Sequence, residues 1–241
     1  MALKNHIADS ITSMNLLSGT LGVIFTFNDR LDIAFLLMLA AAVFDFFDGM
    51  VARMLNAHSN IGKDLDSLSD MVSFGVLPAM MLYKLMCNMV VDNSLWCYIP
   101  LVIAIFSGLR LAKFNVDTRQ TTNFIGLATP ASAMICGSLA YFVSASSNSF
   151  LTQWCQSCWF IPALAIILSA LMVSEIPMFS LKIKKDGDSI TKMKRIAFLT
   201  IAVLCLVVVI VASLNWSMTV LLTLTFYILM NIVFLFVPSK K

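Results

Sequence analysis

Long uninterrupted runs of apolar residues alternate with short polar segments along the chain. About 20 apolar residues in a helix are needed to cross the roughly 30 Å hydrocarbon layer of a bilayer. Runs near this length can be placed at 12–27, 31–53, 66–86, 95–113, 123–145, 158–180, 195–213 and 217–237. The pattern therefore predicts an all-α, polytopic membrane protein of about eight helices, of which the first is the shortest.

Composition agrees with this prediction. Hydrophobic residues make up 60% of the chain and charged residues 12%, and the mean hydropathy is +0.91; these values exclude an ordinary soluble domain. Asp9 interrupts the approach to the first apolar run and no small-residue cleavage site follows, so we expect a retained first helix rather than a secretory signal. Cys155 and Cys158 form a lone CxxC, which favours small apolar fillers over a zinc site.

The basic residues are distributed unevenly between the two sides of the predicted helices. With the N-terminus inside, 14 of the 16 Lys and Arg residues fall on cytoplasmic segments, and only Arg30 and Lys84 fall outside. Excess positive charge marks the cytoplasmic side. We therefore expect an integral protein of the cell membrane with both termini in the cytoplasm.

One long polar linker, residues 182–195, divides the series of helices. The helices before it carry every acidic residue within the predicted spans, whereas the last two are almost wholly apolar. We expect a catalytic transmembrane core of about six helices in residues 1–181, a basic cytoplasmic linker, and a C-terminal helix pair in residues 196–241. The basic residues of the linker are explained by topology and attraction to anionic headgroups, or by contact with a substrate; the first explanation is favoured.

Four aspartates stand at the cytoplasmic ends of the second and third predicted helices. Asp45 and Asp48 are three residues apart, and Asp66 and Asp70 are four apart, so each pair shares one helix face. A short loop makes the two helices antiparallel neighbours, and all four carboxylates then lie at similar depth. Each carboxylate within a hydrocarbon layer costs about 2.5 to 3.5 kcal/mol. The pattern therefore indicates a functional site.

Converging carboxylates need a counter-charge. Oxygen-only ligands favour hard cations such as Mg²⁺ or Mn²⁺, and two such ions roughly 3.5 to 4 Å apart suit attack at phosphorus. The alternatives are interhelical hydrogen bonds between acids, or a proton or cation path. Gly49 leaves space for a ligand beside the helix backbone, and Arg53 offers a planar fork for phosphate oxygens. These neighbours favour a site for metal and phosphate.

The same residues fill the pattern D-x2-D-G-x2-A-R-x8-G-x3-D-x3-D, with Asp45, Asp48, Gly49, Ala52, Arg53, Gly62, Asp66 and Asp70. The pattern resembles the signature of the CDP-alcohol phosphotransferases. The segments GKDLDSLSDMVSFGVLPA from Gly62, LRLAKFN from Leu109, FIGLATPASA from Phe124 and TSMNLLSG from Thr12 are similar to the serine-using branch, the CDP-diacylglycerol–serine O-phosphatidyltransferases. Ala128 departs from that branch, which has proline there.

This resemblance implies a six-helix core, usually dimeric, with a polar cavity open to the cytoplasm. It implies that Asp45, Asp48 and Asp66 hold two divalent ions, Mg²⁺ or Mn²⁺, and that Asp70 also reaches the metal site and acts as general base. It further implies that the CDP-linked lipid contacts Gly49, Arg53 and Ser59, with Thr12 and Asn15 as weaker candidates. Asn15 is equally explained as an interhelical hydrogen-bonding residue.

The resemblance implies that the substrates are CDP-diacylglycerol and L-serine. We expect no nucleic acid among the partners of the protein. The serine hydroxyl attacks the phosphorus that bears diacylglycerol, and CMP leaves. The serine carboxylate needs a cation, and Arg110 and Lys113 at the end of the fourth span are our candidates. The alternative for both is a topological role, with the side chains reaching toward the headgroups.

Two other functions are compatible with part of the pattern. The first keeps the family but uses glycerol phosphate or inositol phosphate as acceptor. The second is a cation or proton transporter with the acids along an ion path. A transporter of this kind is built from repeats, and the sequence shows no internal symmetry.

Overall fold

The computed structural model describes residues 3–55, 60–89, 95–116, 124–146, 149–178 and 189–235. Its elements in chain order are α1 (Leu3–Phe27), α2 (Leu31–Leu55), α3 (Asn60–Asp70), a π-helical segment (Met71–Val76), α4 (Leu77–Met89), a 3₁₀ segment (Leu95–Leu101), α5 (Val102–Val116), β1 (Phe124–Ile125), α6 (Thr129–Ala145), α7 (Phe150–Cys155), α8 (Phe160–Val173), β2 (Pro177–Met178), α9 (Ser189–Val211) and α10 (Ser217–Leu235). The predicted helical membrane fold is confirmed.

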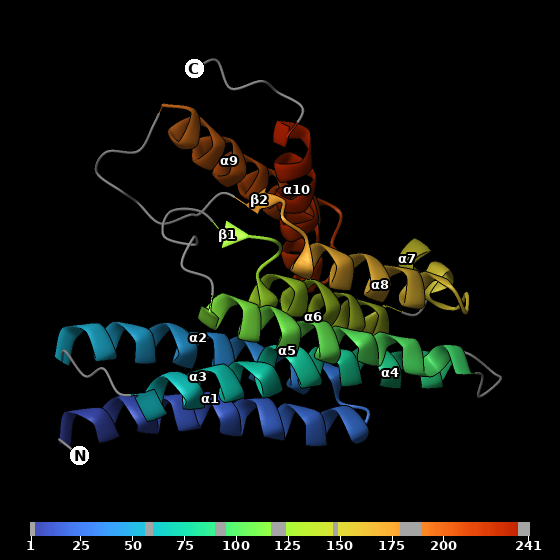
Figure 1. Cartoon of the computed structure of the whole chain (residues 1–241). Helices are drawn as coiled ribbons and strands as arrows, with labels where there is room; N and C mark the ends of the chain where they lie inside the picture. The colour runs from blue at the N-terminus through green and yellow to red at the C-terminus, as the bar shows by residue number, and fades with distance from the viewer. Residues whose placement is uncertain are drawn as a thin grey trace.

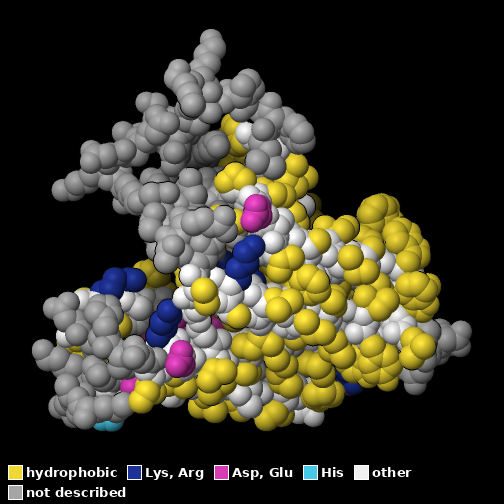
Figure 2. Space-filling model, viewed as in Figure 1, with side chains coloured by type: hydrophobic (Ala, Val, Ile, Leu, Met, Phe, Trp, Pro, Cys, Tyr) yellow, Lys and Arg dark blue, Asp and Glu magenta, His cyan; other side chains and the backbone are white. Residues whose placement is uncertain are grey.

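Among the described residues, five helical stretches are long and apolar enough to cross a membrane. They are His6–Phe27, Leu31–Leu55, Ile61–Met89, Leu95–Val116 and Ser217–Phe234. Three shorter apolar helices, Thr129–Ala145, Phe160–Val173 and Ile196–Val211, correspond to the remaining predicted runs. Figure 2 shows the hydrophobic surface expected of such a protein, with charged side chains gathered mainly toward the left of the view.

The third span is interrupted where the sequence predicts one regular helix. A π-helical turn, Met71–Val76, lies between α3 and α4, and such turns are rare and often mark functional sites. Gly19 of α1 meets this turn closely, because a Cβ at Gly19 would stand 2.8 Å from the Cα of Ser73. Small residues at helix contacts allow this kind of backbone approach in membranes. The close approach fixes α3 and α4 against α1.

The fifth and sixth spans are shorter than predicted. We expected helices over 123–145 and 158–180, but α6 begins at Thr129 and α8 ends at Val173. The residues outside them form a two-stranded antiparallel pair, with Phe124 opposite Met178. Gly126 turns the chain between β1 and α6 with a φ of 74°, a conformation that suits glycine. Because of this turn, and because Pro130 favours the first turn of a helix, α6 begins later in the chain than predicted.

The arrangement of the helices places two layers around a common core. Figure 1 shows α1 and α2 running side by side, with α6 and α8 above them. The largest fully buried side chains include Phe35, Phe74 and Phe142, which come from α2, the π-helical turn and α6. Helix α10 packs against α6 and α9, and in Figure 1 it crosses the direction of the core helices steeply.

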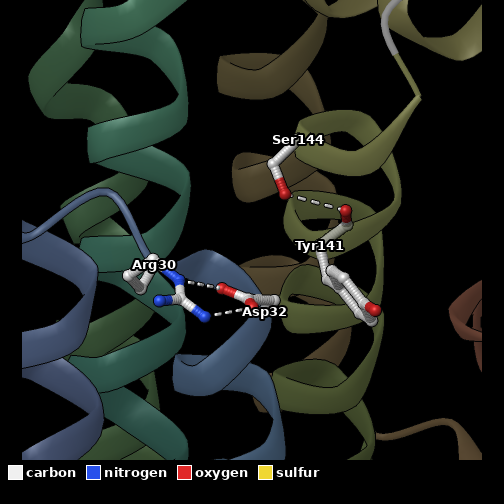
Figure 3. Close-up of polar contacts among 4 residues, drawn as sticks. All are labelled: Arg30, Asp32, Tyr141 and Ser144. Carbon is white, nitrogen blue, oxygen red and sulfur yellow. Dashed lines mark hydrogen bonds and ion pairs between the residues drawn. The ribbon is translucent and has the colours of Figure 1, made fainter.

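The two basic residues that the charge count left outside are both paired with aspartates. Arg30 donates to Asp32 through Nε (3.0 Å) and Nη2 (2.9 Å), as Figure 3 shows beside Tyr141 and Ser144 of α6. Lys84 lies 3.1 Å from Asp29. The Asn88 amide and the Lys84 ammonium hold the pKa of Asp29 below its usual value. These pairs offset the positive charges of Arg30 and Lys84 at this end.

Candidate active site

Three of the four predicted aspartates form one cluster. One carboxylate oxygen each from Asp45, Asp48 and Asp66 lies within 4.8 Å of the other two. Asp45 and Asp48 come from the last turns of α2, and Asp66 comes from α3, so the antiparallel pair brings them together as the helical spacing predicted. The Oδ2 atom of Asp48 is buried and has no hydrogen-bond partner among the described residues.

The cluster has the chemistry of a divalent metal site. Three carboxylates converge, no cation among the described side chains forms an ion pair with them, and one buried oxygen lacks a partner. A buried, unsatisfied carboxylate oxygen is costly unless a cation or proton meets it. Oxygen donors of this kind suit Mg²⁺ or Mn²⁺. The residues therefore fit the divalent ions that the resemblance implies.

Asp70 lies outside this group of three oxygens but remains close enough to interact electrostatically with Asp45 and Asp66. Its Oδ1 atom accepts a hydrogen bond from the Asn15 amide of α1 (3.2 Å). Asn15 is fully buried. The structure thus places Asn15 in the interhelical hydrogen bond that was one of its two predicted explanations, and a nucleotide contact stays a prediction.

Two serines that sequence reasoning did not single out join α1 to the third span. The hydroxyl of Ser69 donates to the Thr12 carbonyl (3.3 Å), and that of Ser73 donates to the Asn15 carbonyl (3.1 Å). Both serines are fully buried. Ser69 and Ser73 are four residues apart, so they share one helix face, and Gly19 approaches this face at Ser73. In the sequence, this spacing is only a weak signal of a helix contact. These bonds fix the register of Asp70 against Asn15.

A second contact braces α3 from the other side. The Asn115 amide at the end of α5 donates to the Ser67 hydroxyl (2.8 Å). Lys63 Nζ donates to the Asn115 carbonyl (3.3 Å). Because Ser67 follows Asp66 directly, α3 is held between α1 and α5 at the level of the cluster.

The predicted lipid-nucleotide contacts lie around the cluster. A Cβ built on Gly49 would meet only the Arg53 Nη1 atom, at 3.7 Å, so the space beside Gly49 is open. Arg53 is exposed and comes from the last turn of α2. Thr12 is buried beside Asp48, with its hydroxyl donating to the Ala8 carbonyl (3.1 Å). Ser59 lies outside the described residues.

The two predicted serine-binding cations are not brought together. Arg110 is only 8% exposed and interacts electrostatically with Asp70, and its Nη1 donates to the Thr129 hydroxyl of α6 (2.9 Å). Lys113, one turn later, is exposed. The structure therefore places Arg110 near the acids and leaves Lys113 in the position expected of a topological residue.

Comparison with known proteins points to one family. The profile described as CDP-alcohol phosphatidyltransferase matches residues 5–171. The CDP-diacylglycerol–serine O-phosphatidyltransferase of Bacillus subtilis is 36% identical over 130 residues, which cover 54% of this chain and 72% of that protein. The enzyme of the same name from Mycobacterium leprae is 33% identical, over 70% of this chain and 56% of that protein.

An archaeal relative adds to the comparison. The archaetidylserine synthase of Methanothermobacter thermautotrophicus is 35% identical over 173 residues, covering 70% of this chain and 67% of that protein. The matched profile includes all four aspartates and the segments around Arg110 and Thr129. Together with the three-carboxylate cluster, these matches confirm the resemblance: the chain belongs to the CDP-alcohol phosphatidyltransferase family of enzymes.

Proposed function

We propose that the protein transfers the phosphatidyl group of CDP-diacylglycerol to the hydroxyl of L-serine and releases CMP. The observation that carries this proposal is that the carboxylate cluster of α2 and α3 lies beside α5, which contacts α3 through Asn115 and Ser67 and carries the buried Arg110 guanidinium. A substrate with a hydroxyl and a carboxylate can meet both groups at once. The names of the relatives, two of them CDP-diacylglycerol–serine O-phosphatidyltransferases, support the same reaction.

In this proposal, Asp45, Asp48 and Asp66 hold two divalent ions, Mg²⁺ or Mn²⁺, and Asp70 reaches the same site. Bound ions of this type neutralise charge on the pyrophosphate and on the leaving CMP. Asp70 accepts the proton of the serine hydroxyl, as a general base must from within hydrogen-bonding reach. Asn15 keeps the Asp70 carboxylate oriented by donating to its Oδ1.

Arg110 binds the serine carboxylate in this proposal. A guanidinium pairs with a carboxylate through two parallel hydrogen bonds, and the low exposure of Arg110 strengthens such a contact by excluding water. Gly49 and Arg53 hold the pyrophosphate side of the lipid, together with Ser59 and Thr12. Lys113 contributes a positive charge at the end of α5.

The proposal also includes the orientation of the protein in the membrane and its oligomeric state. We place both termini and the aspartates on the cytoplasmic side of the cell membrane, where CDP-linked lipid and serine meet. Pairing of Arg30 with Asp32 and of Lys84 with Asp29 supports this orientation. The protein acts as a homodimer, with residues 1–181 as its catalytic part and 196–241 as a C-terminal transmembrane helix pair.

An acceptor panel tests the function directly. The purified protein is given labelled CDP-diacylglycerol and Mn²⁺ with serine, glycerol 3-phosphate or inositol phosphate, and both CMP and the lipid product are identified. We expect CMP release and phosphatidylserine only with serine. Product with a phosphorylated acceptor instead would move the protein to another branch of the family, and no CMP with any acceptor would contradict transfer chemistry altogether.

Replacing Gly49 with leucine is expected to weaken binding of CDP-diacylglycerol. A Cβ at this position meets only Arg53 Nη1 at 3.7 Å, so alanine fits, whereas a branched side chain fills the open space beside the helix. We expect KM for CDP-diacylglycerol to rise at least about tenfold for Gly49→Leu, the effect of losing about 1.4 kcal/mol of binding free energy. Gly49→Ala is the matched control, and equal KM values for both variants would make Gly49 a packing residue.

Replacing Arg110 with glutamine is expected to raise KM for serine far more than KM for CDP-diacylglycerol. A hydrogen bond to a charged group contributes about 1.5 to 3 kcal/mol, which is about 10- to 150-fold in KM. Lys113→Gln, on the exposed side of α5, is the comparison. An equal loss for both substrates in Arg110→Gln would assign the guanidinium to the pyrophosphate instead.

A further inference from the structure

The guanidinium of Arg110 is held by a residue from a second helix. Its Nη1 atom donates to the Thr129 hydroxyl at 2.9 Å, and its Cζ atom lies 5.8 Å from the centre of the Phe114 ring. Thr129 is fully buried. A hydrogen bond at one corner and a cation–π contact on the face together fix the plane of the guanidinium.

Thr129 holds one corner of the Arg110 guanidinium. A guanidinium carries five N–H donors in one plane, and Thr129 occupies the Nη1 corner. The buried Nε atom has no hydrogen-bond partner within the described part of the chain. Because buried donors are nearly always paired, the unpaired Nε, which lies on the edge of the guanidinium that also carries Nη2, indicates a missing ligand. That edge matches a carboxylate with two parallel hydrogen bonds.

The position of Thr129 is set by the turn before α6. The Gly126 amide donates to the Ile176 carbonyl (2.9 Å), and the Leu127 amide donates to the Leu171 carbonyl (2.9 Å). These bonds attach the turn to the end of α8 and to the segment after it. Thr129 then begins α6, where the helix dipole adds partial positive charge for an anion. The strand pair and the turn therefore present one hydroxyl to Arg110.

We propose that Thr129 is a positioning residue for the acceptor: its hydroxyl holds Arg110 so that the Nε edge of the guanidinium receives the carboxylate of an amino-acid substrate. This inference rests on the proposed serine transfer. Arg110 lies on α5, which contacts α3, the helix of Asp70, through Asn115 and Ser67, so an acceptor held at Arg110 by its carboxylate can direct its hydroxyl to the base. Thr129 thereby selects an acceptor that carries both groups.

The test compares Thr129→Val, which keeps the shape of the side chain without its hydroxyl, with Thr129→Ser, which keeps the hydroxyl. We expect Thr129→Val to raise KM for serine about tenfold, the loss of one hydrogen bond to a charged group, with KM for CDP-diacylglycerol unchanged. Thr129→Ser is expected to stay near the wild type. Ser138→Ala, which removes another buried hydroxyl of α6, one that donates to the Ile135 carbonyl within the helix, is the matched control.

A double variant shows whether Thr129 acts through Arg110. Because residues that act as a unit give non-additive effects, Arg110→Gln with Thr129→Val is expected to have the serine KM of Arg110→Gln alone. Additive effects in the double variant would overturn the inference, and so would an unchanged serine KM in Thr129→Val. An equal rise of the KM values for serine and CDP-diacylglycerol in both Thr129→Val and Thr129→Ala would overturn it as well. Wild-type protein that forms no phosphatidylserine would instead refute the proposed function, so the two failures are distinguishable.

Discussion

Asp70→Asn is expected to lower turnover by about 10²- to 10⁴-fold, the usual contribution of a positioned general base. Asparagine has the same shape as aspartate, and its Oδ1 atom can still accept the hydrogen bond that Asn15 donates at 3.2 Å. The contacts of Ser69 and Ser73 with α1 do not involve Asp70. The variant should therefore fold and bind CDP-diacylglycerol, but its amide cannot take the proton of the acceptor.

The measurement separates chemistry from binding. Single-turnover CMP release gives the rate of the chemical step, and binding of labelled CDP-diacylglycerol gives the affinity. Asp64→Asn is the matched control, because Asp64 is an exposed acid of the same helix α3. Near-normal single-turnover rates in Asp70→Asn would remove Asp70 from the base role, whereas a loss of lipid binding would make it a ligand or structural residue.

The convergence of the aspartates could be predicted because it depends on local rules. Helical spacing puts Asp45 and Asp48 on one face, and a short loop folds α3 back beside α2, which brings Asp66 to them. The position of Asp70 was harder to predict. Its distance from the group depends on packing against α1, where Asn15 meets it, and on a π-helical turn that begins at Met71. No periodic pattern in the sequence specifies that turn.

The surroundings of Arg110 could not be predicted from the sequence, for a different reason. Arg110 and Lys113 lie one helical turn apart and look alike as candidates, yet one is buried and the other exposed. Thr129 also reaches Arg110 from α6 and accepts a hydrogen bond from it. Thr129 is placed by a turn that pairs with the chain near Ile176, about 50 residues later. Long-range pairings of two residues leave no recognisable hydrophobic pattern.

The metal site provides the second large effect. Asp45→Asn and Asp66→Asn are each expected to raise the Mn²⁺ concentration for half-maximal activity by at least about tenfold. Replacing residues that only orient a metal ligand already costs about 10- to 100-fold in affinity or activity, and these two carboxylates supply oxygens to the cluster itself. An amide oxygen is a neutral and weaker donor for a hard cation.

Two readouts distinguish loss of metal from loss of structure. Mn²⁺ bound by the purified protein is measured directly by paramagnetic resonance, and activity is measured across the same titration. Excess Mn²⁺ is expected to restore part of the activity of both variants, because the remaining two carboxylates of the cluster still converge within 4.8 Å. Asp64→Asn again serves as the control. Titration curves that overlay the wild type would show that Asp45 and Asp66 do not hold metal, and the unpaired Oδ2 of Asp48 would then require a proton or another cation.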